Sequence, residues 1–245
     1  MEPKNTVAKT VKSQIDAFTE GYVFSYLDIE GAAKNREAII KSLNRLVEKG
    51  IIDKLVKGKF YKPIKSEYGK SGPDINEVVK DLLENKGEVI GYMTGFSVLN
   101  KYGLTTQISN TIKIGRNTFK PPLKRGIYTI EFVLQKNVIT KENVKILQVL
   151  DSLKMLKDIP DTTRDNSLSL LGRIIRKYNK ADKEMLIELS KKYPPSTRAL
   201  LGMIFEGEKI MGPLDKIRET LNPISTYNMG IRQIDSFLKE KWGIK

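Results

Sequence analysis

The chain has 245 residues, no cysteine, no histidine and a formal net charge of +14. The absence of cysteine excludes disulfides and thiolate zinc modules, and the absence of histidine removes the commonest general base and metal ligand. So basic a chain favours a polyanionic partner such as DNA or RNA. No apolar run approaches the ~20 residues of a membrane span, and the N-terminus lacks a signal-peptide core, so we expect a cytoplasmic protein without a membrane partner.

The first elements are predicted from short apolar patterns. Apolar residues recur at helical spacing over residues 7–18 and predict a first helix, which ends at Gly21. Residues 22–29, YVFSYLDI, alternate weakly and predict a short strand. A turn or brief helix is expected next, at residues 28–33.

Positive charge is concentrated in residues 34–65, which carry ten Lys or Arg and three acids, whereas residues 1–33 sum to −2. Asn35 is a suitable N-cap, and apolar residues then repeat every three or four positions up to Gly50. The opposite face of this helix is cationic and polar, as a helix that reads base edges requires. We predict a recognition helix with the candidate DNA-binding residues Lys34, Asn35, Arg36, Lys41, Asn44 and Arg45; the alternative is a solvated helix face.

Two β-prone runs follow, IIDKLV and KFYKP, joined by Lys57-Gly58. This two-residue connection suits a tight hairpin, because Gly58 tolerates a positive φ. A helix followed directly by a cationic hairpin is typical of a winged helix-turn-helix, in which the wing lies along the DNA backbone. We predict this module for residues 1–65, with double-stranded DNA as its ligand, although some winged helices bind proteins. The wing candidates are Lys54, Lys57, Lys59, Tyr61 and Lys62.

A second, larger domain is predicted for residues 76–245. Residues 66–75 are polar, contain glycine and carry Pro73 before a helical pattern, which indicates a linker. Beyond it, a helix ending near Gly87, another between Gly95 and Gly103 and two strand-like runs at residues 107–114 and 126–135 indicate a mixed α/β domain. Four helical patterns from residue 144 to 206 indicate a C-terminal helical layer, and residues 231–242 form a closing amphipathic stretch. The predicted fold class is α+β.

Residues 113–125 carry five cations and no acid. They form either a second phosphate-binding or partner surface, or an exposed solubilising loop. The candidates are Lys113, Arg116, Lys120, Lys124 and Arg125.

Catalytic motifs are missing from the sequence. It contains no Asp-x-Asp pair, no Walker lysine motif, no Gly-x-Ser-x-Gly elbow and no Gly-x-Gly-x-x-Gly loop. We therefore predict no enzyme, no metal and no cofactor. A metal-dependent nuclease stays a minor alternative because of Asp74 and Asp161, each preceded by proline, but each pair lies at a predicted helix start, where Asp is a common cap. Asp151, Asp158 and Asp161 are interpreted as solvated or capping carboxylates.

Residues 91–114, GYMTGFSVLNKYGLTTQISNTIKI, resemble the Gly-Tyr-x-x-Gly, small residue, Leu, Gly-Leu-Thr signature that opens the C-terminal domain of AbiEi-like antitoxins. Residues 34–63 look like the winged helix of that family, and residues 193–202, YPPSTRALLG, are similar to a segment of its close relatives. The resemblance covers roughly the first 205 residues, and the remainder matches less clearly. In the signature, Gly91, Gly95, Gly103 and Leu104 are expected to be packing and turn residues.

The resemblance implies an antitoxin of a type IV toxin–antitoxin system. In that family the winged helix binds repeats in its own promoter and represses it, while the larger domain counters a nucleotidyltransferase toxin without requiring a stable complex. By position, the residues that match the recognition helix of that family are Lys34, Arg36, Lys41, Asn44 and Arg45, and those that match its wing are Lys57, Lys59 and Lys62. The alternative is a plasmid replication initiator or another winged-helix DNA-binding protein. An initiator should carry a second helix-Gly-hairpin pattern after residue 75, and the sequence shows none.

Overall fold

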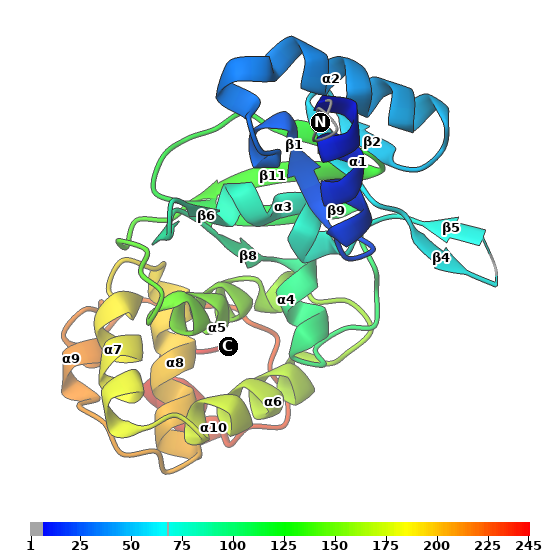
Figure 1. Ribbon diagram of the computed structural model, residues 1–245. Helices are drawn as coiled ribbons and strands as arrows, with labels where there is room; N and C mark the ends of the chain where they lie inside the picture. Colours follow the sequence, from blue (N-terminus) through cyan, green and yellow to red (C-terminus); the bar gives the residue numbers. More distant parts are fainter. Residues whose placement is uncertain (1–6, 68) are drawn as a thin grey trace, which may run out of the picture. The chain divides into compact units, whose positions relative to one another are not determined.

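The computed structural model describes residues 7–67 and 69–245 (Figure 1). Helices and strands alternate along the chain and several small sheets form, so the predicted α+β class is confirmed. The chain folds as two compact units, which comprise Met1–Asp81 with Lys124–Ile127, and Leu82–Leu123 with Tyr128–Lys245.

The first unit contains a winged helix-turn-helix. Its elements are α1 (Val7–Ala17), β1 (Val23–Ser25), the 3-10 helix η1 (Tyr26–Asp28), α2 (Ala32–Glu48), β2 (Asp53–Val56) and β3 (Lys59–Tyr61). The three strands form one antiparallel sheet in the order β1-β3-β2. Helices α1 and α2 pack together above it, and their apolar stripes form a core with Phe24 and Phe60 of the sheet. The helical periods and the Lys57-Gly58 turn predicted from the sequence are confirmed.

Helix α2 is broken near its start. Asn35 has φ −126° and ψ 30°, outside the helical range, so one short turn precedes it and the long helical segment begins at Arg36. The sequence placed a helix boundary at the same residue. Ile39, Leu43 and Leu46 then face the core.

The first unit extends further than the sequence indicated. Where a linker was expected at residues 66–75, the chain forms the antiparallel hairpin β4 (Ile64–Ser66) and β5 (Gly69–Ser71), followed by α3 (Ile75–Leu83). The start of α3 is attached to the winged helix, because the Glu77 carboxylate accepts a hydrogen bond of 2.9 Å from the Val23 amide and the Lys80 ammonium lies 3.7 Å from the centre of the Tyr22 ring. These contacts explain why the division between the units falls within α3.

A four-stranded sheet has the strand order β10-β11-β9-β8, and apart from Lys124 and Arg125 of β10 it belongs to the second unit. Its strands are β8 (Tyr92–Thr94), β9 (Thr111–Arg116), β10 (Leu123–Arg125) and β11 (Tyr128–Leu134), with the small hairpin β6 (Glu84–Asn85) and β7 (Glu88–Val89) before them and α4 (Phe96–Lys101) after β8. Strands β9 and β11 are parallel and β8 is antiparallel to β9. The two predicted strand runs correspond to β9 and β11, whereas β8 and β10 were not predicted.

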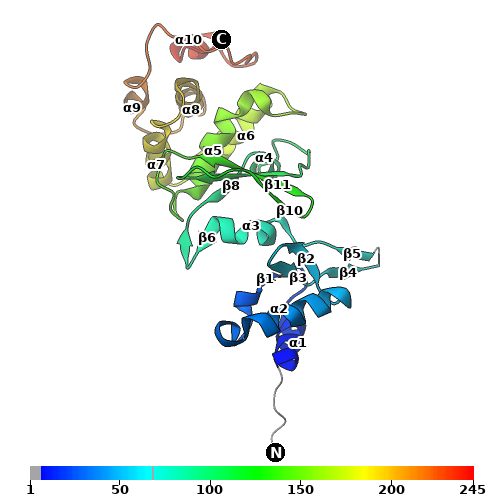
Figure 2. The same ribbon diagram turned by 90° about the horizontal axis from the view of Figure 1, so that it is seen from above.

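A layer of helices completes the second unit (Figure 2). It comprises α5 (Val144–Lys154), the 3-10 helix η2 (Leu156–Asp158), α6 (Arg164–Arg176), α7 (Lys180–Ser190), α8 (Pro195–Gly207), α9 (Asp215–Arg218) and α10 (Ser236–Lys241). Helix α5 contacts β8 as well as α6, α7 and α8, so residues 146–153 are buried on every side. The predicted helical layer is confirmed, although only Ser236–Lys241 of the closing stretch is helical.

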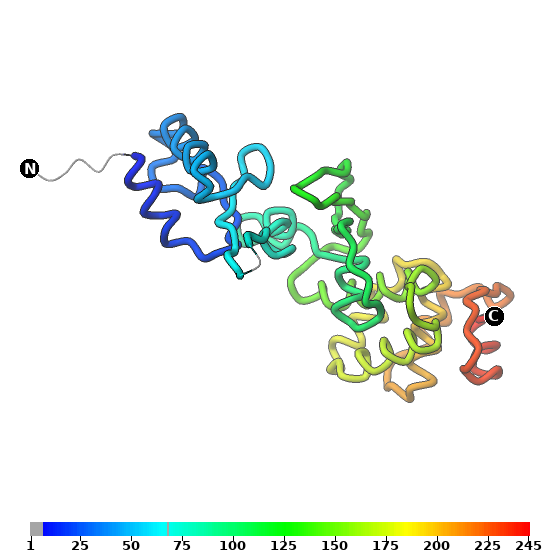
Figure 3. Tube along the Cα trace, turned by 90° about the vertical axis from the view of Figure 1, so that its right-hand side faces the viewer, coloured from blue at the N-terminus to red at the C-terminus, as the bar shows by residue number. Residues whose placement is uncertain are grey.

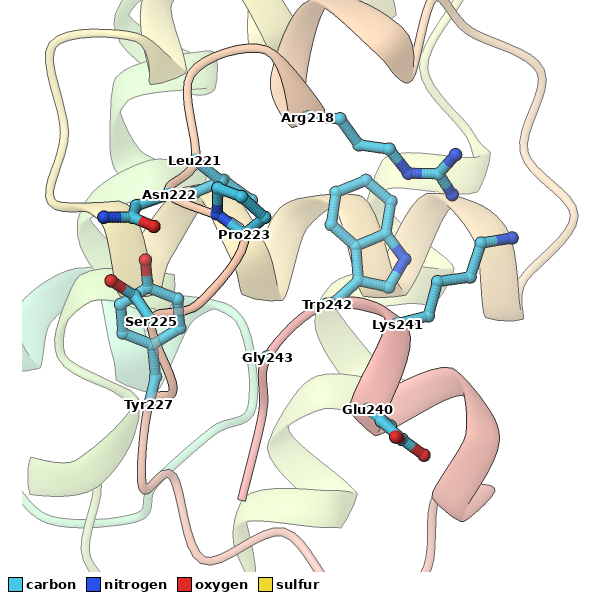
Figure 4. Close-up of a pocket in the computed structure, with 10 residues that line it drawn as sticks. All are labelled: Arg218, Leu221, Asn222, Pro223, Ser225, Tyr227, Glu240, Lys241, Trp242 and Gly243. Carbon is cyan, nitrogen blue, oxygen red and sulfur yellow. The ribbon is translucent and has the colours of Figure 1, made fainter.

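The C-terminal segment, which contains α10, packs against α8 (Figure 3). Trp242 is buried against Gly202, and its indole Nε1 donates a 2.9 Å hydrogen bond to Glu206. Arg218 lies over the indole ring, and together with Trp242 it lines a small cavity of about 180 Å³ (Figure 4). Within the described ranges, no helix has the length and apolar character needed to cross a bilayer.

Candidate nucleic-acid interface

The predicted recognition residues of α2 are all on its surface, and three of them, Lys41, Asn44 and Arg45, lie together on its outer face. Lys34, Asn35, Arg36, Lys41, Asn44 and Arg45 are all exposed. The Arg36 guanidinium lies 5.2 Å from the centre of the Tyr26 ring, a cation–π contact that positions this side chain at the start of the long helical segment. The six side chains are therefore available to an external ligand from one helix.

A shallow depression on this face adds residues that the sequence reasoning did not name. It is lined by Glu37, Ile40, Lys41, Asn44, Arg45 and Glu48. Glutamate can accept a hydrogen bond from the cytosine amino group, and an apolar side chain can contact the thymine methyl group, while Asn and Arg pair with adenine and guanine. The helical spacing of 37, 41, 44 and 48 is the signal that could have identified the two glutamates.

The wing residues separate into free and engaged side chains. Lys54 and Lys57 are exposed, and neither ammonium group contacts a partner within the part of the chain that the structure describes. Lys59 instead forms a 3.0 Å ion pair with Asp81. Lys62 donates hydrogen bonds of 2.9 and 2.8 Å to carbonyl oxygens at the end of α1, those of Asp16 and Phe18. Two of the four predicted wing lysines therefore hold the first unit together.

Tyr61, the remaining wing candidate, is half-buried in β3. Burial raises the pKa of its hydroxyl, and the nearby Asp53 carboxylate raises it further. The hydroxyl therefore stays protonated as a hydrogen-bond donor. Only part of this side chain is open to an external ligand.

The five residues of the predicted second basic surface are not gathered on one exposed face. Arg125 is buried and makes a bidentate contact of 2.5 and 2.9 Å with Asp81, and it also donates to the Val78 carbonyl. Arg116 is buried too, with Nε and Nη1 lacking a partner among the described residues. Lys113 is half-buried, so only Lys120 and Lys124 are exposed. Two of the five cations, Arg116 and Arg125, are thus buried, and Arg125 is held there by Asp81 and the Val78 carbonyl.

The pKa of Asp81 reflects its two cationic partners. Burial raises the pKa, but the hydrogen bonds and charges of Arg125 and Lys59 outweigh that effect and hold it below its usual value. Asp81 is thus a charged anchor that neutralises two cations of the first unit.

Asp151 is buried in the second unit, which corrects its interpretation as a solvated or capping carboxylate. Its side chain accepts hydrogen bonds from the hydroxyls of Tyr92 at 2.7 Å, Thr94 at 2.8 Å and Tyr193 at 2.8 Å. Gln135 donates to both tyrosine hydroxyls, at 2.8 and 2.9 Å. Burial raises the pKa of Asp151, and the three hydroxyl donors oppose that rise. A buried carboxylate is tolerated here because three hydroxyl groups donate hydrogen bonds to it.

The glycine-rich signature has a structural role around this cluster. A Cβ atom on Gly91 would lie 2.8 Å from the Leu82 carbonyl oxygen, so only glycine lets β8 begin there. Tyr92 and Thr94 of the signature then reach Asp151, while Leu104 is buried in the core. The expectation that the signature residues pack and turn the chain agrees with these contacts.

The two carboxylates considered for a nuclease have local partners. Asp74 accepts a 2.8 Å hydrogen bond from the Asn76 amide at the start of α3, and Asp161 accepts from Thr105 and Gln107. Among the residues described, no three acidic side chains form a cluster that could hold a metal ion.

Comparison with known proteins places the chain in a family. The profile of DUF6088, a family of unknown function, matches residues 9–205. The chain belongs to DUF6088. No curated protein matches the sequence. Among solved structures, the RV2827C protein from Mycobacterium tuberculosis is similar, with 12% sequence identity and a TM-score of 0.55 over 91% of this chain and 84% of that chain. At this identity the similarity concerns the fold alone.

The DUF6088 match spans both the winged helix and the Asp151 cluster. It ends within α8, so the C-terminal segment that carries Trp242 lies outside it. The DUF6088 match thus contains α2, the β2–β3 hairpin and the glycine-rich signature.

Proposed function

We propose that this protein is a DNA-binding transcriptional autorepressor and the antitoxin of a type IV toxin–antitoxin system. The observation that carries the DNA-binding part is the exposed outer face of α2, where cationic and amide side chains lie free of intramolecular ion pairs in the described part of the chain. This face belongs to a winged helix-turn-helix, an architecture that places such a helix in the major groove.

Different residues of this interface are suited to different parts of the duplex. Asn44 and Arg45 carry the groups that pair with the edges of adenine and guanine, so we assign them to sequence readout. Lys54 and Lys57 are free cations on the hairpin and are assigned to phosphate contacts, which supply affinity without sequence preference. The proposed ligand is double-stranded DNA from the promoter of the protein's own operon.

The antitoxin part rests on the resemblance of residues 91–114 and 193–202 to AbiEi-like proteins. Both segments contribute hydroxyl groups to Asp151, through Tyr92, Thr94 and Tyr193, which gives the two separated motifs a common structural purpose. The proposed target is a nucleotidyltransferase toxin, countered without a stable complex. A repressor of this kind acts in the cytoplasm.

A reporter gene under the protein's own upstream region tests the repressor role. The wild-type chain should repress the reporter, and Asn44→Ala with Arg45→Ala should relieve repression while leaving the protein folded. Lys177→Ala, at an exposed position of the second unit, is the control and should repress normally. Repression by the double variant at the wild-type level would refute the assignment of α2.

Co-expression with a nucleotidyltransferase encoded beside the gene tests the antitoxin role separately. The Asn44→Ala, Arg45→Ala variant should still restore growth, because the second unit is unchanged. Growth arrest that the wild-type chain fails to relieve would refute the antitoxin role while leaving the repressor role standing.

A further inference from the structure

A cavity of about 300 Å³ opens in the second unit beside the Asp151 cluster. Its walls come from the end of β11, from α5 and from the turn between α7 and α8. This volume lies at the lower end of the range of about 300–1,000 Å³ that is typical of small-molecule sites. Neither the recognition helix nor the wing contributes to it.

Three lysines from separate elements surround this cavity: Lys136, Lys154 and Lys192. All three are exposed, and none forms an ion pair with a carboxylate in the described part of the chain. Lys192 Nζ donates instead to the carbonyl oxygen of Lys136, at 3.2 Å, which brings two of the lysines close together. Asp151, which interacts electrostatically with Lys154, is the acidic residue of the lining, so the three ammonium groups leave the cavity with an excess of positive charge that favours an anionic ligand.

The inner end of the cavity is polar and firmly held. Asp151 and Tyr193 both line it. The Tyr193 hydroxyl donates a hydrogen bond to Asp151 and accepts one from Gln135, so both side chains are held in place. The carboxylate edge offers an acceptor to a ligand N–H or O–H group. Pro194 and Pro195 add apolar rings to the wall, and α8 begins at Pro195, which directs the positive end of its dipole to the same side.

These features call for a ligand with two different ends. One end must be strongly anionic to satisfy three ammonium groups, and phosphate does this through charge-assisted hydrogen bonds. The other end must be compact and partly apolar, with hydrogen-bond donors for the buried carboxylate. We propose that this cavity binds a nucleoside monophosphate, with its phosphate at Lys136, Lys154 and Lys192 and its nucleoside against Tyr193 and Asp151.

Isothermal titration of the full chain with AMP, GMP, CMP and UMP tests this proposal, with inorganic phosphate and the four nucleosides measured in parallel. At least one nucleotide should bind more tightly than phosphate and than its own nucleoside. Lys154→Gln with Lys192→Gln should weaken that binding about tenfold or more, because two charge-assisted contacts are lost. Lys177→Gln with Lys180→Gln removes the same charge from exposed positions outside the cavity and should bind as the wild type does.

The result that would overturn the proposal is a failure of all four nucleotides to bind, or equal binding by the two double variants. A 5′-phosphorylated hexanucleotide distinguishes a free nucleotide from a nucleic-acid end, and tighter binding of the hexanucleotide than of every mononucleotide would also overturn the proposal. The Lys154→Gln, Lys192→Gln variant should retain wild-type affinity for promoter DNA, so the cavity and the winged helix are tested independently.

Discussion

The same substitution should weaken a different property at each of two lysines of the wing region, Lys57 and Lys62. Both lose one positive charge on replacement by Gln. Lys57 is exposed at the turn between β2 and β3, whereas the Lys62 ammonium group is engaged with the carbonyl oxygens of Asp16 and Phe18. Lys57→Gln should therefore weaken DNA binding, and Lys62→Gln should mainly weaken folding.

The magnitudes follow from the free cations of the interface. Of the cationic residues predicted on the recognition helix and the wing, six are exposed and free of an ion pair in the described chain: Lys34, Arg36, Lys41, Arg45, Lys54 and Lys57. If each neutralises one phosphate, the slope of log K against log salt is about −5 for one protein chain, since each contact contributes about −0.9. Lys57→Gln should reduce the slope by about 0.9, which corresponds to about eightfold in affinity for each decade of salt.

Fluorescence anisotropy with a labelled duplex, measured over a series of KCl concentrations, gives the slope for each variant. Urea unfolding of the same preparations gives the free energy of unfolding, which Lys62→Gln should lower by about 1–2 kcal/mol through the loss of two charged hydrogen bonds. Equal slopes for both variants would show that the distinction between free and engaged lysines is wrong. An unchanged slope for Lys57→Gln alone would exclude the hairpin from the phosphate contacts.

Three further substitutions test the packing and the buried charges. Gly202→Ala should destabilise the second unit by about 1–3 kcal/mol in urea unfolding, because the new Cβ would overlap the indole ring of Trp242. This cost exceeds the advantage of about 1 kcal/mol that alanine has over glycine in a helix. Equal or greater stability would contradict this packing. Tyr193→Phe should cost about 1.5–3 kcal/mol, because Asp151 loses a hydroxyl donor while its charge stays buried, and a cost near zero would show that this hydrogen bond is not formed. Asp81→Asn should lower the free energy of unfolding at neutral pH. Because the folded-state pKa of Asp81 is below its unfolded value of 3.8, the stability difference from the wild type should shrink as the pH falls from about 5 through that folded pKa. A difference that does not change with pH would contradict the ion pairs.

Local patterns were sufficient to predict the winged helix. The apolar stripe of α2 follows the helical period, and the turn at Lys57-Gly58 depends on adjacent residues only. The exposed face of α2 follows directly from that stripe, because residues opposite the buried positions must face outward. The exposed residues of α2 could therefore be named from the sequence, whereas their role in DNA recognition stays a prediction.

Long-range contacts account for what could not be predicted. Lys59 looked equivalent to Lys57 in the sequence, and only its 3.0 Å approach to Asp81 shows that it is engaged. The extent of the first unit likewise depends on the bond between Glu77 and Val23, residues that are 54 positions apart. Such partners are set by the tertiary fold and leave no trace in local periodicity.

Asp151 was misread although the sequence carried a signal. It lies four residues after Leu147 and four before Met155, in a row of apolar residues at helical spacing. A carboxylate within an apolar stripe is expected to be buried and hydrogen-bonded. Its partners Tyr92 and Tyr193 come from distant segments, so the cluster itself needed the structure.

The affinity of the full chain for its own upstream region, compared with a scrambled duplex of equal length at about 0.15 M salt, tests the central claim most directly. The wild type should prefer the upstream duplex by about 10³-fold or more. Asn44→Ala and Arg45→Ala should each reduce that preference by about 1–3 kcal/mol. Equal affinity of the wild-type chain for both duplexes would contradict the claim that α2 reads a DNA sequence.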